Sequence, residues 1–229
     1  MKTKLNPTLE LIKNRYSVRV FKDQEPNWSE VQQVVESAAY AASSKNTQPW
    51  TLNLVKGETL QALRAAYLNA FDGGRKPESP YEYAPQPMPD EWMALARECG
   101  FSLFKHKGIA RDDRQARQAH GRENFAFFNA PGVFFLSTLI DAGLGNFLDC
   151  GLFLQNLVTG LSSIGLGSVP MFSAVAYPDL VKKFCPESQD LLICGLTFGV
   201  PDEDAHVNQF RTTRRELNKW FHINGDTHE

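Results

Sequence analysis

Residues 144–164 place the strongest limit on how this chain can fold. Apolar side chains recur around nearly the whole circumference of the helix that this segment predicts: Phe147, Leu148, Leu152, Leu154, Leu157, Val158, Leu161 and Ile164. A helix that is apolar on all sides must be buried on all sides. The chain has 229 residues, enough for one domain with a single core, and so small a domain seldom encloses such a helix alone. We therefore expect a second copy of the chain to cover part of it, which favours a dimer.

The other elements follow from apolar spacing and from helix and turn signals. Asn27 can cap a helix whose apolar stripe is Val31, Val34, Val35, Ala38 and Ala42. Alternating or continuous apolar runs predict strands at 51–55, 133–139 and 191–200, with an extended segment at 168–171. Further helices are predicted near Leu11 and at 58–71, 91–104, 112–128 and 178–184. With no internal repeat, residues 1–229 form one expected domain, with a helical insert at about 72–128.

Composition argues against several classes of partner. The formal charge is −2 and basic residues are scattered except at 111–122, so nucleic acid is not an expected partner. The four cysteines form no Cys-x-x-Cys pair and no histidine stands at metal-ligand spacing, so we expect free thiols in a reducing compartment and no metal site. Residues 1–10 lack a signal-peptide core, and the longest apolar run, 133–140, is far too short for a bilayer. A cytoplasmic protein without membrane contact is the expectation.

Two polar segments near the amino terminus indicate a ligand. Arg15, Ser17 and Arg19 alternate, so in an extended stretch two guanidiniums and a hydroxyl point the same way, which suits one anionic group. Residues 43–48 carry short polar side chains that can hydrogen-bond a polyhydroxy chain or a heteroaromatic edge. Together they indicate a phosphorylated, hydroxyl-rich ligand.

These segments carry a family resemblance. Arg-x-Ser-x-Arg at 15–19, followed by Ser-Ser-x-Asn-x-Gln-Pro-Trp at 43–50, resembles the amino-terminal signature of the nitroreductase family. Two further strings agree in chain order: Gly-Leu-Gly-Ser-Val-Pro-Met-Phe-Ser at 165–173, and Phe-Arg-Thr-Thr-Arg at 210–214 behind a Gly-Val-Pro turn. The resemblance spans residues 11–217. Within the insert, residues 111–131 resemble the subgroup that acts on nitroaromatic compounds.

The resemblance implies a fold and a reaction. The fold is α+β in three layers, with a central mixed, largely antiparallel sheet flanked by helices, in an intertwined homodimer with two flavin mononucleotide (FMN) sites. The reaction is FMN-dependent reduction of nitroaromatic or quinone-like acceptors by NADH or NADPH. Donor and acceptor use the same flavin face in turn, by a ping-pong mechanism.

It also implies roles for residues that bind the cofactor. Arg15, Ser17 and Arg19 contact the phosphate, the ribityl chain or the pyrimidine side, and Arg214, with Arg211 as a second candidate, closes on the phosphate. An ordinary ion pair is the alternative role for these arginines. Ser43, Ser44 and Asn46 reach the flavin of the other subunit, or else only terminate a helix and form a turn.

The segment Met171, Phe172 and Ser173 offers backbone donors near flavin N5, with Phe172 N–H nearest and Ser173 beside it; its alternative role is a simple strand end. Phe125, Phe128 and Tyr81, with Phe127 and Tyr83, are candidates for an aromatic lid that contacts substrate, although phenylalanines at helical spacing more often pack in the core. No side chain is expected as a catalytic acid or nucleophile, because the five histidines are scattered and form no catalytic pattern.

Two alternatives stay open. The same fold hosts dehalogenating, oxidising and flavin-fragmenting enzymes, and the insert at 72–128 would decide among them. The other alternative is a non-enzymatic flavin-binding dimer, inert to reduced nicotinamide.

Overall fold

A four-stranded sheet forms the centre of the protein. The structure is a computed structural model that describes residues 6–188 and 191–225. The strands are β1 (Thr51–Lys56), β2 (Gly132–Thr138), β3 (Gly167–Met171) and β4 (Leu191–Gly199), in the order β1-β2-β4-β3. All three strand pairs are antiparallel. Every residue of β2 is buried, which confirms the predicted central strand.

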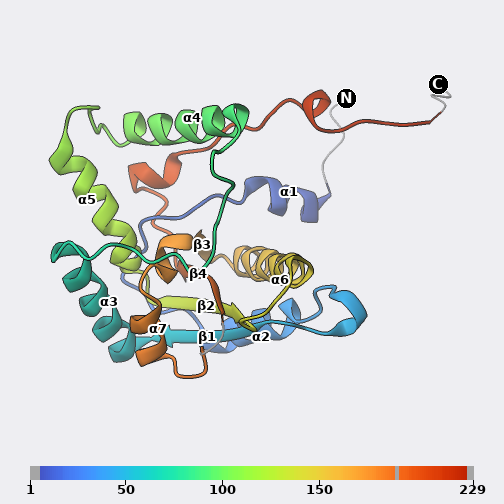
Figure 1. Ribbon diagram of the computed structural model, residues 1–229, viewed down its shortest axis with the longest axis horizontal. Helices are drawn as coiled ribbons and strands as arrows, with labels where there is room; N and C mark the ends of the chain where they lie inside the picture. The colour runs from blue at the N-terminus through green and yellow to red at the C-terminus, as the bar shows by residue number, and fades with distance from the viewer. Residues whose placement is uncertain (1–5, 189–190, 226–229) are drawn as a thin grey trace.

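Helices cover both faces of this sheet (Figure 1). Along β2, Val133 and Phe135 face one side while Phe134 and Leu136 face the other, as strand geometry requires. On the first side pack α3 (Gly57–Asp72), α5 (Arg114–Phe125) and α7 (Pro178–Phe184), and on the second α2 (Trp28–Ala38) and α6 (Leu144–Ser163). The predicted three-layer α+β architecture is confirmed.

The chain that follows α1 (Pro7–Asn14) runs beside β3. Ser17 and Ser168 form a parallel bridge, and the Val18 N–H donates to the carbonyl oxygen of Ser168 at 3.1 Å. A Cβ on Gly167 would overlap the Val18 side chain, so only glycine allows this approach. All strand pairs of the described sheet are antiparallel, so the only parallel pairing among the described residues is this isolated bridge, which fixes the segment that carries Arg15 and Arg19.

The helix α4 (Asp90–His106) lies apart from the sheet, at the top of Figure 1, beside the carboxyl-terminal segment. Arg215 forms an ion pair with Glu91 at 2.6 Å, and the rings of His106 and His206 stack with centroids 4.0 Å apart. Residues 72–128 therefore contact the part of the chain that carries Arg211 and Arg214.

Two predicted helix ends are wrong. The helix α2 ends at Ala38, where Asn156 of α6 donates its amide to the Ala38 carbonyl at 3.4 Å, and Ala41 is buried in place of Ala42. The helix predicted at 112–128 ends at Phe125. Phe127, Phe128 and Asn129 have positive φ, so the α-helix cannot continue to residue 128, and Ala130 is extended because proline disfavours a helical residue in front of it.

The helix α6 is buried on one face only within the single chain. Phe153, Leu157 and Leu161 lie in the core, whereas the exposed fractions of Leu144, Leu148 and Leu152 are 90%, 66% and 43%. One chain alone therefore does not bury α6 on all sides, as the sequence predicts.

Among the residues that the structure describes, none of the helices has the length and hydrophobicity needed to span a membrane. Residues 1–5, part of the segment examined for a signal peptide, and His228, one of the five histidines, lie outside the residues that the structure describes.

Candidate active site

One cavity gathers five predicted site residues from both ends of the chain. Its volume is about 770 Å³, and its lining includes Arg15, Ser17, Arg19, Arg211 and Arg214. The first three come from the segment bridged to β3, and the last two follow the short helical turn His206–Gln209. Residues nearly 200 positions apart thus form one arginine cavity.

The guanidiniums of the arginine cavity have no carboxylate within ion-pair distance among residues 6–188 and 191–225. This disfavours the ion-pair role for the four arginines. Burial lowers the pKa of Arg15, and the charge of Arg214 lowers it further. Burial also lowers the pKa of Arg19. Four guanidiniums around one cavity, two of which repel each other, suit an anion with more than one negative charge.

A second cavity leads from the arginine cavity towards the end of β3. It has a volume of about 350 Å³, and Arg15, Ser17, Pro170 and Gln155 are part of its lining. β3 ends at Met171, and Phe172 begins a short helical turn that includes Ser173. An elongated ligand with its anionic end on the arginines can therefore extend past Ser17 towards Phe172.

Aromatic rings of the insert meet Phe172. The ring centroids of Tyr81 and Tyr83 lie 5.1 and 5.0 Å from that of Phe172, and the Tyr81 hydroxyl donates to the Ile193 carbonyl at 2.7 Å. Burial raises the pKa of Tyr81, which keeps the hydroxyl a donor. Phe125 and Phe128 are only 9% and 6% exposed and lie in the core beside α3. Their placement favours the packing role over contact with substrate.

The polar loop Ser43–Gln48 lies elsewhere, near the amino-terminal half of α6. The Ser44 N–H donates to the carboxylate of buried Asp149 at 3.3 Å, and the Gln48 N–H donates to Ser43 Oγ at 3.1 Å. Lys45, Asn46 and Gln48 have positive φ, a conformation that costs free energy in residues other than glycine. Neither Ser43, Ser44 nor Asn46 lines the arginine cavity of its own chain.

The profile of the nitroreductase family matches residues 12–200. The chain belongs to the nitroreductase family. Several relatives match along nearly the whole chain. A 4-nitrobenzoate reductase of Pseudomonas putida is 30% identical, with 94% of each protein covered, and nitroreductase NfnB of Mycolicibacterium smegmatis is 31% identical, with 91% of this chain and 89% of that protein covered.

Solved structures of nitroreductases agree with this fold. The FMN- and NADPH-dependent nitroreductase NfnB from Sphigopyxis sp. strain HMH superposes with a TM-score of 0.92 at 30% identity, covering 96% of this chain and 100% of the other.

Two residues in or beside the arginine cavity were missed by sequence reasoning. Tyr16 places its ring 3.6 Å from the guanidinium carbon of Arg211, a cation–π contact, and Asn208 is a buried amide that hydrogen-bonds the segment of Arg19. The position of Tyr16 between Arg15 and Ser17 was a usable signal. No local signal identifies Asn208, because its partners in the arginine-bearing segment, Arg19 and Val20, are almost 190 residues away.

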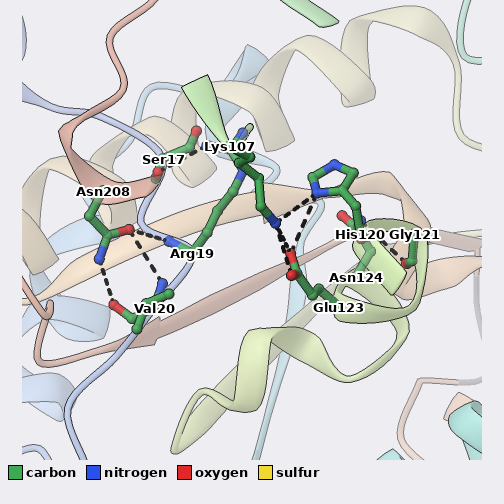
Figure 2. Close-up of polar contacts among 9 residues, drawn as sticks. All are labelled: Ser17, Arg19, Val20, Lys107, His120, Gly121, Glu123, Asn124 and Asn208. Atoms are coloured by element: carbon green, nitrogen blue, oxygen red, sulfur yellow. Dashed lines mark hydrogen bonds and ion pairs between the residues drawn. The ribbon is translucent and has the colours of Figure 1, made fainter. Parts of the chain in front are cut away.

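The segment 72–128 holds an ion cluster beside Arg19 (Figure 2). Lys107 donates to both oxygens of the Glu123 carboxylate, at 2.6 and 2.8 Å, and His120 lies 3.4 Å from that carboxylate. Burial raises the pKa of Glu123, but the hydrogen bonds from His120 and Lys107 outweigh it, so the net pKa is below its usual range. The cluster ties α4 and α5 together.

We expect Glu123→Gln to destabilise the protein only where the carboxylate is charged. A lowered folded-state pKa gives stability that is present above the ordinary glutamate pKa, about 4.3, and is lost as the pH falls through the lowered value. At pH 7 the loss should be about 1 kcal/mol, since the carboxylate is partly exposed, or about 2–4 °C in Tm.

Thermal unfolding of both proteins between pH 3 and pH 8 tests this expectation, with Glu30→Gln on the exposed face of α2 as the control. A Tm difference between wild type and Glu123→Gln that stays constant in acid would contradict it.

Proposed function

We propose that this protein is an FMN-dependent oxidoreductase that uses NADH or NADPH to reduce nitroaromatic or quinone-like acceptors by a ping-pong mechanism. The observation that carries the proposal is the arginine cavity, where Arg15, Ser17, Arg19, Arg211 and Arg214 meet. The names of the relatives support it, since they are reductases of nitroaromatic compounds or FMN- and NADPH-dependent nitroreductases.

The residues present fit FMN. Its phosphate carries close to two negative charges, and the unpaired guanidiniums can hold it with charge-assisted hydrogen bonds. Ser17 and the second cavity provide a polar path for the ribityl chain towards Pro170. The arginine cavity alone, at about 770 Å³, falls within the range of about 300–1,000 Å³ that is typical of cofactor sites.

Each part of the site then has a role in the reaction. Bound FMN would supply the chemistry, by taking up hydride and passing it to an acceptor. By the family resemblance, the backbone N–H of Phe172, with Met171 and Ser173 on either side, would donate towards flavin N5. Tyr81 and Tyr83 pack on the Phe172 ring and restrict the space beside this strand end. No acidic side chain is required, because the last proton can come from water.

We also propose a homodimer. Leu144, Leu148 and Leu152 are spaced four residues apart, so they share one exposed face of α6. A second copy that covers this face would bury several leucines, each worth about 1.5–3 kcal/mol. It would also give Ser43, Ser44 and Asn46 the neighbouring subunit's flavin to contact, since they lie outside the arginine cavity of their own chain.

The chain as a whole is proposed to be one FMN-binding domain with a helical insert at about 72–128. The free thiols of Cys99, Cys150, Cys185 and Cys194 support the further proposal that it works in a reducing compartment, the cytoplasm.

Absorbance spectroscopy tests the proposed reaction. The purified protein should bind FMN, and under anaerobic conditions NADPH or NADH should bleach the flavin absorbance. Addition of 4-nitrobenzoate or a quinone should then restore it. A flavin that stays oxidised with both nicotinamides would point to the non-enzymatic alternative. Bleaching without recovery by either acceptor would point to another reaction of the same fold.

A further inference from the structure

Asn208 is a buried amide at the point where the two arginine-bearing segments meet. It is 1% exposed and lies on the short helical turn His206–Gln209, just before the segment of Arg211. A buried amide is costly unless its donors and acceptors are satisfied. Its Oδ1 accepts from the backbone N–H groups of Arg19 and Val20, at 2.8 and 3.3 Å, and its Nδ2 donates to the carbonyls of Val20 and Asp202, at 2.7 and 2.8 Å.

These contacts act on both segments of the arginine cavity. The side-chain amide fixes the backbone of Arg19, as Figure 2 shows. The backbone carbonyl of the same residue accepts from Arg211 Nη1 at 2.6 Å. One residue therefore orients an arginine from each end of the chain, although Asn208 does not line the cavity.

Such a device matters because Arg15 and Arg214, one from each segment, repel each other. Arg15, Arg19, Arg211 and Arg214 line one cavity without a carboxylate partner in the described part of the chain. Without support, the two segments would move apart until an anion drew them together, and that movement would weaken anion binding. A neutral amide holds them in place without cancelling any of their charge.

We propose that Asn208 is a positioning residue that sets the affinity of the arginine cavity for a phosphate group, by holding Arg19 and Arg211 in their binding arrangement before the ligand arrives. The inference rests on the proposed function, because it takes the phosphate of FMN as the anion. Its distinguishing consequence is selectivity: loss of Asn208 should weaken binding of FMN but not of riboflavin, which is FMN without the phosphate.

The experiment measures dissociation constants of FMN and riboflavin by flavin fluorescence for the full-length apoprotein and for Asn208→Ala and Asn208→Ser. Both substitutions leave the net charge unchanged and keep the backbone carbonyl that accepts from Arg211, so they test the contacts of the side-chain amide with Arg19 and Val20. Loss of a residue that orients ligand-binding groups typically costs about 10–100-fold. We therefore expect the preference for FMN over riboflavin to fall by about that factor in Asn208→Ala. It should fall less in Asn208→Ser, whose hydroxyl can keep one of the contacts. The serine variant also supplies the measurement if the alanine variant does not fold.

The matched control is Asn53→Ala. Asn53 also has a side chain held by a hydrogen bond, from its Nδ2 to Ser188 Oγ at 2.6 Å, but it lies on β1 and lines no part of the arginine cavity. It should lower Tm while leaving the preference for FMN unchanged. If Asn208→Ala and Asn208→Ser lower Tm without changing the preference, the role of Asn208 is structural and the proposal is overturned. If the wild type shows no preference for FMN over riboflavin, the phosphate site of the proposed function fails instead.

Discussion

Replacing Arg15 and Arg19 together by alanine is expected to raise the dissociation constant for FMN by about 10²- to 10⁴-fold. Each charge-assisted hydrogen bond to a phosphate is worth about 1.5–3 kcal/mol, so two arginines contribute about 3–6 kcal/mol. Both line the arginine cavity, and neither has a carboxylate partner among the described residues to leave unpaired. Flavin fluorescence gives the dissociation constant, and steady-state turnover with NADPH should fall once FMN is subsaturating.

The control for charge is Arg97→Ala with Arg114→Ala. Both side chains lie outside the arginine cavity, and their loss changes the net charge by the same two units. The control should bind FMN within a fewfold of the wild type at 0.15 M salt, where distant charges are screened over about 8 Å. Riboflavin affinity should change little in either double variant. Full retention of FMN affinity by the Arg15 and Arg19 variant would remove the basis of the proposed function.

Part of this site could be predicted because its chemistry is local. Arg15, Ser17 and Arg19 follow the period of an extended chain, so their shared direction is readable from the sequence. The contact of this segment with Arg211 and Arg214 arises from the tertiary structure and cannot be read from local sequence. It was expected only through the family resemblance, and the structure shows one cavity lined by both segments.

The wrong predictions and the missed residues also result from contacts between segments that are distant in the sequence. The apolar spacing of α2 continues past Ala38, but an amide of α6 satisfies the last carbonyl, and the chain turns so that Ala41 is buried. Helical spacing cannot tell a phenylalanine of the core from one that faces a ligand, and Phe125 proved to be in the core. Asn208 was not predicted as a site residue, because nothing near it in the sequence shows that its side chain bonds to Arg19 and Val20.

The substitution Leu148→Asp tests the proposed homodimer. Leu148 is exposed on α6, so the folded chain should tolerate aspartate there. In the proposed dimer the carboxylate would be buried against apolar side chains without a partner, at a cost of several kcal/mol. We expect the dimer dissociation constant to rise by about 100-fold or more, giving monomers at micromolar concentration.

Activity should fall with the dimer, because Ser43, Ser44 and Asn46 would lose the neighbouring flavin while the arginine cavity stayed intact. Sedimentation velocity gives the oligomeric state, and far-UV circular dichroism checks that the chain is still folded. Leu148→Met, similar in size and uncharged, should remain dimeric and active.

The decisive measurement is flavin binding by the Leu148→Asp monomer. The monomer should bind FMN more weakly than the wild type does. It should still bind FMN more tightly than riboflavin, because the phosphate contacts come from one chain. A folded Leu148→Asp monomer with undiminished FMN affinity and turnover would show that each chain holds its flavin alone. The loop around Ser44 would then have no role across a subunit interface.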